Sequence, residues 1–195
     1  MRTAVISVNT GRTRQIAIGS RTVATAYAKT PTAGPVAVRP LGLEGDEQAD
    51  LSVHGGLSKA VYAYPVEHYA VWRTLRAQAG AAAWDATLPH GAFGENLTLS
   101  GLLEADAWIG DRLCFEGGVE LAISEPRYPC HKFDAAMGFR QAAKMMVQSG
   151  QCGFYLQVAV PGAIAAGEHY VLRAGAREVG IAELFRARTR RGATT

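Results

Sequence analysis

Short runs of apolar residues, many of them bracketed by glycine or proline, recur along the chain. Several runs alternate between apolar and polar positions or are rich in β-branched and aromatic residues, which is typical of strands. This pattern predicts strands at residues 3–8, 59–65, 111–115, 119–124, 153–160 and 168–173.

Longer segments carry apolar residues at helical spacing and predict a few helices. Pro65 suits the first turn of a helix that continues to residue 80. Asp134 is a candidate N-cap for a second helix that continues to residue 150. A third, shorter helix is expected over residues 181–191.

Many short strands with few helices predict a mostly β fold, a barrel decorated with helices. The chain contains neither of the glycine-rich motifs GxGxxG and GxxxxGK[ST] that mark nucleotide-binding βαβ folds. Residues 30–50 are rich in proline and glycine, and we expect them to form an irregular loop over the surface or over a site.

The composition indicates a globular chain. Its 195 residues, 48% hydrophobic and 19% charged, are enough to bury one core, which excludes disorder. No apolar run approaches the roughly 18 residues of a membrane span, and the amino terminus turns polar too early for a signal peptide. Three widely spaced cysteines suit a reducing compartment, so we expect a cytoplasmic protein that contacts no membrane.

The net charge of +3 comes from the carboxy-terminal end of the chain. From Arg173 onward there are six arginines and two glutamates, whereas residues 1–172 carry 14 basic and 15 acidic groups. A nucleic-acid-binding protein would normally spread its basic residues over a face. We therefore expect a small-molecule partner and no nucleic acid.

The segment "LEGDEQADLSVHGGLSKAVY" is the first that could carry chemistry. Asp46, Asp50 and His54 recur at intervals of four, which would align three metal ligands on one helical face. The following Gly55–Gly56 pair makes an unbroken helix doubtful. An alternative is a polar loop in which His54, Lys59 and glycine amides hold an anion, and an ordinary turn is as consistent with the residues.

A second candidate segment is "HGAFGENLTLSGL", in which Glu95 and Asn96 precede a strand-like run. Their side chains can hydrogen-bond a polar heterocycle. They can equally cap a turn, and the residues alone leave both interpretations open.

The segment "SEPRYPCHKF" surrounds Cys130 with basic residues. Pro126 and Pro129 favour a stiff, extended loop. Arg127 and Lys132 would stabilise a thiolate at Cys130 by Coulomb attraction. The residues leave open whether that thiolate serves a metal or an electrophile.

Other residues near these segments receive simpler interpretations. His131 adjoins Cys130 and makes a poor general base, because neighbouring side chains on an extended segment point apart. A cysteine hydrolase would need another histidine, such as His54. Cys114 and Cys152 lie at predicted strand edges with few basic neighbours, and we interpret them as structural.

Taken together, "GD…D…HGG…KAVY", "GAFGENLT", "GDRL", "SEPRYPCHKF" and "GFYLQVAVPGAIAAGE" resemble the MOSC domain family, most closely its YiiM-like branch. The resemblance covers about residues 40–173. It implies a MOSC-type β-barrel, similar to the pyruvate-kinase insertion barrel, with a molybdopterin-type cofactor in a cleft. It also implies reduction of N-hydroxylated compounds, hydroxylaminopurines and amidoximes, with the oxygen leaving as water.

The resemblance also assigns roles to residues. The hallmark cysteine of the family falls on Cys130, which it implies is the catalytic residue and a molybdenum ligand. Asp46 and Asp111 are expected only to brace loops. The cofactor-binding positions implied are His54, Gly55, Gly56, Lys59, Glu95, Asn96, Arg127 and Lys132.

The sequence is therefore expected to form one MOSC domain over residues 1–175 and a short basic helical tail over residues 176–195. It has no four-cysteine ferredoxin-like motif, so electrons would come from a separate donor protein. Two alternatives stay open: a non-enzymatic module that binds the molybdenum cofactor or carries a persulfide on Cys130, and a cofactor-free cysteine hydrolase or plain structural barrel. The oligomeric state is open too, with a homodimer among the options.

Overall fold

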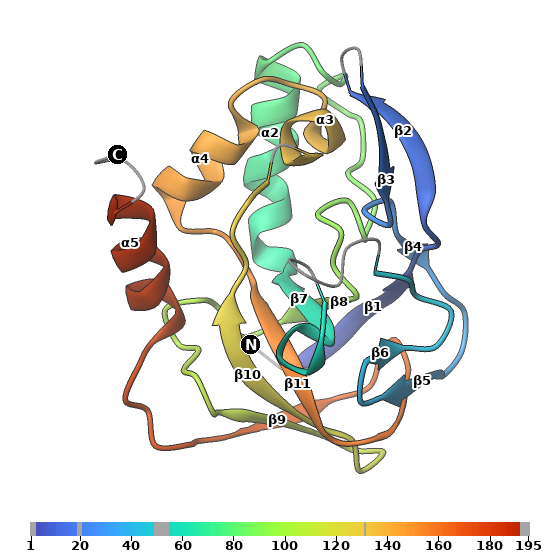
Figure 1. Cartoon of the computed structure of the whole chain (residues 1–195), viewed down its shortest axis with the longest axis vertical. Coiled ribbons are helices and arrows are strands. Elements are labelled where there is room, and N and C mark those ends of the chain that lie inside the picture. Colours follow the sequence, from blue (N-terminus) through green and yellow to red (C-terminus); the bar gives the residue numbers. More distant parts are fainter. Residues whose placement is uncertain (1–2, 19–20, 49–54, 131, 192–195) are drawn as a thin grey trace.

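The computed structural model describes residues 3–18, 21–48, 55–130 and 132–191. One large mixed sheet organises them (Figure 1). Its strand order is β13-β9-β10-β11-β7-β8-β1-β4, with β7 and β8 parallel and the other described pairs antiparallel. The strands are β1 (Ala4–Thr10), β4 (Thr30–Pro31), β7 (Val61–Pro65), β8 (Leu97–Ser100), β9 (Arg112–Phe115), β10 (Glu120–Pro126), β11 (Phe154–Val160) and β13 (Tyr170–Arg173).

Each strand predicted from the apolar runs is confirmed, with its ends shifted by a few residues, but several short strands were missed. The expected irregular loop over residues 30–50 is wrong in part, because distant strands pair with it: β4 joins β1, and β5 joins β12. The missed strands of the smaller sheets are β2 (Arg14–Ile18), β3 (Arg21–Thr25), β5 (Val36–Arg39), β6 (Gly42–Leu43) and β12 (Gly162–Ile164).

The large sheet curves until its two ends approach each other. The Val5 N–H donates to the Glu168 carbonyl at 2.9 Å, the Gly167 N–H donates to the Val5 carbonyl at 2.7 Å, and a bridge joins Ala4 to His169. Among the described residues no continuous strand ladder completes the closure. The sheet-dominated fold is therefore confirmed, whereas the barrel remains a prediction.

The first predicted helix is confirmed. A 3₁₀ turn, Val66–His68, follows Pro65 and leads into α2 (Tyr69–Gln78). The buried ring of Trp72 faces the rings of Phe93 and Phe133, with centroids 5.7 and 5.3 Å away. This contact packs α2 against the loop before β8 and against α3, which follows the cysteine loop.

The second predicted helix is wrong as a single element. It divides into α3 (Lys132–Met137) and α4 (Ala142–Ser149), because Gly138 and Gln141 both have left-handed backbone angles between the two helices. Asp134 lies inside α3 and caps the next helix instead. Its carboxylate accepts hydrogen bonds from the Gln141 N–H at 3.3 Å and the Ala143 N–H at 2.8 Å.

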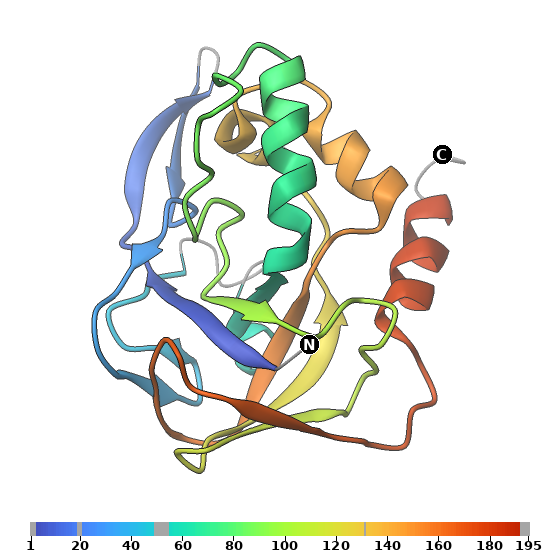
Figure 2. The same ribbon diagram turned by 180° about the vertical axis from the view of Figure 1, so that it is seen from behind.

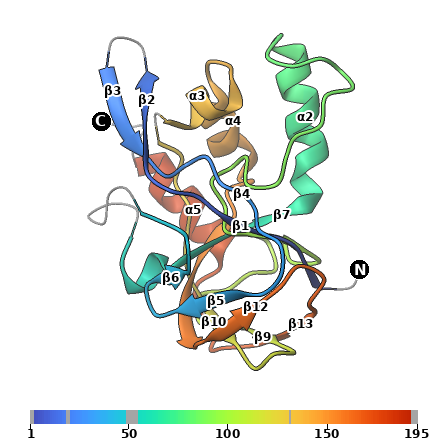
Figure 3. The ribbon, with the colours of Figure 1, turned by 90° about the vertical axis from the view of Figure 1, so that its right-hand side faces the viewer.

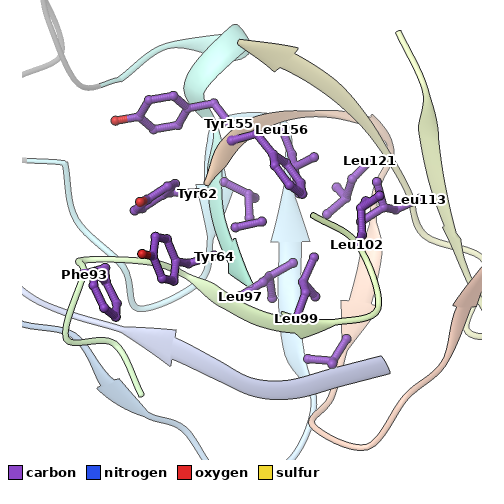
Figure 4. Packing of buried hydrophobic residues seen from close by; sticks show 14 of the residues in the cluster. Tyr62, Tyr64, Phe93, Leu97, Leu99, Leu102, Leu113, Leu121, Tyr155 and Leu156 are labelled. Atoms are coloured by element: carbon purple, nitrogen blue, oxygen red, sulfur yellow. The ribbon is translucent and has the colours of Figure 1, made fainter. Parts of the chain in front are cut away.

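The core lies inside the curve of the large sheet. Leucines from β8, β9, β10 and β11 fill it, and Figure 4 shows them on one side of a column formed by Tyr155, Tyr62, Tyr64 and Phe93. The Tyr64 and Phe93 rings stack 3.9 Å apart. The hydroxyl groups of the three tyrosines point away from the leucines (Figure 4), so this column marks the border between the core and a polar region.

The third predicted helix is confirmed as α5 (Ile181–Arg191), at the edge of the molecule against β10 (Figures 1 and 2). Ile181 and Phe185 are fully buried, and the Phe185 ring stacks on Tyr128 at 5.3 Å. The basic end of the chain thus packs on the body of the fold, and the boundary at residue 175 remains a prediction. No helix among the described residues has the length and apolar character to cross a membrane.

Candidate functional site

The loops that carry the candidate motifs meet at one open cleft, with a cavity volume of about 90 Å³. β3 and the segment after it form one wall, the loop before β8 a second, and the loop after β10 with Tyr62 and Tyr155 a third. The lining residues are Thr25, Ala26, Tyr27, Lys29, Asp46, Glu47, Gln48, Lys59, Tyr62, Phe93, Gly94, Asn96, Arg127, Cys130, Lys132 and Tyr155.

The most unusual group in the cleft is the guanidinium of Arg127, a residue that is only 4% exposed. It lies 5.5 Å from the centroids of the Tyr27, Tyr62 and Phe133 rings. Burial opposes its charge, but Coulomb attraction to the neighbouring tyrosine and cysteine side chains outweighs burial and raises the pKa of Arg127. Among the described residues no carboxylate pairs with it, so a permanent positive charge faces the cleft.

Cys130 lies half-buried in the loop between β10 and α3 and forms no disulfide. It lines the same cleft as Tyr27, Arg127 and Tyr155. Tyr62 and Tyr155 are cross-strand partners on β7 and β11, with ring centroids 5.4 Å apart. The sheet register therefore places two aromatic residues beside the cysteine loop.

The Tyr27 hydroxyl is buried and has no hydrogen-bond partner among the described residues. Burial raises its pKa, so the group keeps its proton. Gly94 makes room for the ring, because an added Cβ there would lie 3.3 Å from Cδ2 and Cε2 of Tyr27. A buried donor without a partner is costly in a folded chain, and in a cleft wall it suits a bound ligand.

Asp46 and Asn96 hold the walls together. The Asp46 carboxylate accepts hydrogen bonds from the Gly11 N–H at 2.8 Å, from the Lys29 ammonium and from the Asn96 amide at 2.8 Å. The same amide donates to the Asn9 carbonyl at 3.3 Å, and its oxygen accepts from the Tyr62 N–H at 3.1 Å. Asp46 is thus the brace that was expected, and Asn96 lines the cleft with both amide hydrogens already used.

Asp111 also braces loops as predicted, outside the cleft. It is fully buried and accepts hydrogen bonds from the Gly175 N–H at 2.8 Å and from the Arg177 guanidinium at 3.1 and 3.3 Å. These contacts attach the segment after β13 to the start of β9.

Glu95 does not line the cleft. Its fully buried carboxylate accepts hydrogen bonds from the Gly91 N–H at 2.7 Å, the Phe93 N–H at 3.0 Å, the Thr98 hydroxyl at 2.8 Å and the Tyr69 hydroxyl. It therefore shapes the loop before β8, because all of these donors belong to that loop or to its neighbours. The cofactor-binding role given to Glu95 is not supported by this placement.

Two lysines predicted for the site do reach the cleft. Lys59 ends the 3₁₀ turn Leu57–Lys59, with its ammonium 3.9 Å from the Glu125 carboxylate and 5.9 Å from the Tyr155 ring centroid. The Lys132 ammonium donates to the Ala24 carbonyl at 2.9 Å, which ties the start of α3 to β3. Both add positive charge to the cleft.

The structure therefore brings together Lys59, Asn96, Arg127, Cys130 and Lys132. Gly55 and Gly56 lie outside the cleft lining, although the left-handed Gly56 begins the turn that carries Lys59.

His54, Asp50 and His131 lie outside the described residues. Among the residues that are described, no group of three His, Cys, Asp or Glu side chains could hold a metal ion.

Sequence reasoning missed Tyr27 and Lys29, both of which line the cleft. They lie in "ATAYAKT", a stretch without a motif, and reach the site through a hairpin that was itself missed. The glycines of "HGAFGEN" were the available signal. An added Cβ on Gly91 would lie 2.5 Å from the Lys29 carbonyl oxygen, so that loop requires a close backbone neighbour.

A sequence profile of the MOSC domain matches residues 50–171, well over half of the chain. The chain belongs to the MOSC domain family. The match includes Lys59, Asn96, Arg127, Cys130 and Lys132, and so covers most of the predicted site.

Relatives place this MOSC chain near YiiM. It is 37% identical to Protein YiiM of Escherichia coli over 142 residues, 72% of this chain and 60% of that protein. It is 32% identical to a protein named Reductase from Gibberella moniliformis over 164 residues, 84% of this chain and 28% of the fungal protein. The chain therefore spans less than two thirds of either relative.

The crystal structure of YiiM from Geobacillus stearothermophilus superimposes with a TM-score of 0.74 at 32% identity, covering 95% of this chain and 83% of that one. The fold and the YiiM-like character of the MOSC domain are thus supported by sequence and by structure.

Proposed function

We propose that this MOSC domain binds a molybdenum cofactor in the cleft and reduces N-hydroxylated compounds, such as hydroxylaminopurines and amidoximes. The observation that carries the proposal is the buried Arg127 guanidinium, which lacks a carboxylate partner among the described residues and faces the same cleft as the Cys130 thiol. A soft sulfur ligand beside a fixed positive charge suits a metal delivered on an anionic organic group.

The lining of the cleft supports a molybdopterin through its charge, its aromatic rings and a hydrogen-bond donor. Arg127, Lys59 and Lys132 can bind a phosphate. The Tyr62 and Tyr155 rings offer an aromatic wall to a flat heterocycle. The unpartnered Tyr27 hydroxyl offers a hydrogen-bond donor.

The residues of the cleft then have different roles. Cys130 provides the protein's metal ligand, and Arg127 with Lys59 holds the phosphate. Asn96 does not donate to the ligand, because its amide hydrogens are used, but it fixes the wall that carries Asp46 and Tyr62. Lys132 keeps β3, and with it Tyr27, close to the cysteine loop.

The reaction converts R–NH–OH, two electrons and two protons into R–NH₂ and water, so one N–O bond breaks. When bound, the cofactor supplies the two-electron chemistry. The contribution of the chain is to bind and orient the substrate. Tyr27 keeps its proton because burial raises its pKa, so it can donate a hydrogen bond to the oxygen that leaves.

We also propose that electrons come from a separate donor protein and that the enzyme works in the cytoplasm. The three cysteines are free thiols, and two of them lie away from the cleft lining. The name Reductase borne by the fungal relative supports a redox role for the family branch.

The proposal is tested with protein purified from a molybdate-fed host that makes the cofactor. A chemical reductant is supplied with benzamidoxime or 6-hydroxylaminopurine, and the amidine or amine is measured by chromatography. We expect reduction by the wild type and none by Cys130→Ala. Bound pterin without turnover would favour a cofactor or persulfide carrier instead, and acyl transfer that needs His54 would favour the hydrolase.

A further inference from the structure

A second cavity of about 450 Å³ adjoins the first. It lies between the β2–β3 ribbon and the helices α2 and α3, which stand at the same end of the molecule in Figures 1 and 3. The two cavities share Thr25, Tyr27, Lys29 and Lys132 as wall residues. A ligand that begins at Cys130 and passes this shared wall would therefore enter the second cavity.

The second cavity is strongly cationic. Arg14, Lys29, Arg76 and Lys132 line it, and no aspartate or glutamate lines it among the described residues. Lys29 is paired with Asp46, so the charges left for a ligand are those of the other three. The chain body as a whole has no basic excess, since residues 1–172 carry 14 basic and 15 acidic groups. The charge is thus concentrated here.

The two arginines keep donors free for a ligand. Arg76 uses its Nε to bond the Met137 carbonyl at 3.0 Å, which orients the guanidinium beside α3, and no described residue accepts a hydrogen bond from its other nitrogens. Arg14 is an exposed residue at the start of β2 and also lines the cavity. Planar guanidinium groups bind the oxygens of an anion such as a phosphate in pairs, which favours an anionic group over a neutral one.

Most of the remaining lining is apolar, and the Thr25 and Tyr27 side chains of the shared wall add hydroxyl groups. Leu88, Pro89 and Ala92 come from the loop before β8, and Ala135 and Ala136 from α3. The volume of the cavity, about 450 Å³, lies within the roughly 300–1,000 Å³ common for small-molecule sites. The cavity therefore has room for a ribose with its phosphate.

We propose that the second cavity is a phosphate subsite for the substrate, and that the natural substrates are nucleoside monophosphates with an N-hydroxylated base. The base would lie at Cys130, and the phosphate would lie between Arg14 and Arg76. This inference deepens the proposed function and rests on it for the reaction at the base. The subsite itself can be tested without the metal.

The test titrates cofactor-free protein with 6-hydroxylaminopurine ribonucleoside and with its 5′-monophosphate, by calorimetry. We expect the monophosphate to bind at least about tenfold more tightly, as for one or two charge-assisted hydrogen bonds. The ratio of the two affinities, monophosphate over nucleoside, should fall with added salt. It should approach one in Arg76→Gln and in Arg14→Gln, and the second variant guards against a folding defect caused by loss of the Met137 contact.

Arg73→Gln is the matched control, because Arg73 lies exposed on the same helix and outside both cavities. It should keep the wild-type ratio. Equal affinities in the wild type, or a ratio that Arg76→Gln and Arg14→Gln leave unchanged, would overturn the subsite.

Two further outcomes separate the sources of the phosphate. If Arg76→Gln and Arg14→Gln lower retention of the molybdenum cofactor but not affinity for the monophosphate, the cavity serves the cofactor and the proposal is wrong. If the affinity ratio behaves as expected in protein that never takes up molybdenum, the phosphate subsite stands and the proposed reductase function fails.

Discussion

At the scale of single residues, the chemistry of the cleft depends on groups whose environment conflicts with their polarity. Arg127 keeps its charge while buried among aromatic rings, and the Tyr27 hydroxyl is buried without a partner among the described residues. Such groups lower the stability of a folded chain unless something binds them. The sequence predicted Arg127 from its place near Cys130, but nothing near Tyr27 in the chain marks that residue, because its neighbours come from distant strands.

Tyr27→Phe separates function from stability. Removing a buried hydroxyl without a partner should raise the free energy of unfolding of cofactor-free protein by about 1 kcal/mol, while weakening ligand binding. Tyr64→Phe is the control: its hydroxyl donates to the Gln151 carbonyl at 3.1 Å, so its loss should cost about 1 kcal/mol. Urea denaturation measures both. Equal destabilisation by the two changes would show that the Tyr27 hydroxyl has a structural partner.

At the scale of elements, the longer strands and the amphipathic helices were predicted from their own residues. The short strands were not, because they depend on partners far away in the sequence. β5 and β6 exist because β12 pairs beside them, and that partner lies far away in the sequence. The break between α3 and α4 escaped prediction for another reason. Apolar residues lie on both sides of Gly138, but Gly138 and Gln141 have left-handed backbone angles, and Asp134 caps the start of a new helix.

The loop before β8 should show a pH dependence through Glu95. Burial raises the pKa of this carboxyl, although hydrogen bonds from Tyr69 and Gly91 act against the shift. The folded chain then holds the proton more tightly than the unfolded chain, so the contribution to stability is greatest below the ordinary pKa of about 4.3 and declines as the pH rises.

Glu95→Gln cannot titrate at this position and provides the reference. The free energy of unfolding of the wild type, relative to that of the variant, should decrease between about pH 4 and pH 7. Chemical denaturation at a series of pH values measures the difference. If the free energy of unfolding of the wild type, relative to that of the variant, instead grows with pH, the hydrogen bonds to Glu95 outweigh burial in setting its pKa.

The helix α5 should be part of the folding unit. Phe185→Ala removes a fully buried ring that stacks on Tyr128, two residues before Cys130, and should lower the free energy of unfolding by about 3–5 kcal/mol. Arg186→Ala, exposed on the same helix, should change it by less than about 0.5 kcal/mol. If both variants have the same free energy of unfolding as the wild type, α5 is not part of the folding unit. The predicted domain boundary at residue 175 would then be supported.

At the scale of the whole molecule, the sequence predicted a sheet-dominated MOSC fold, and both the family match and the strand order support it. It also predicted a cleft with Cys130, Arg127, Lys59, Asn96 and Lys132, which the structure assembles. What it could not predict is the second cavity. That cavity forms between the missed β2–β3 ribbon and two helices, so its charge emerges only when the chain is folded.

The central claim is that Cys130 holds a molybdenum cofactor in this cleft. The most direct test is the molybdenum content of protein freshly purified from a molybdate-fed host, by mass spectrometry, together with the fluorescence of the oxidised pterin. We expect about one molybdenum per chain in the wild type and in Cys114→Ala, whose half-buried thiol lies outside the cleft, and loss of the metal in Cys130→Ala. Folded wild-type protein that stays free of metal after incubation with intact cofactor, or equal metal in Cys130→Ala, would contradict the account.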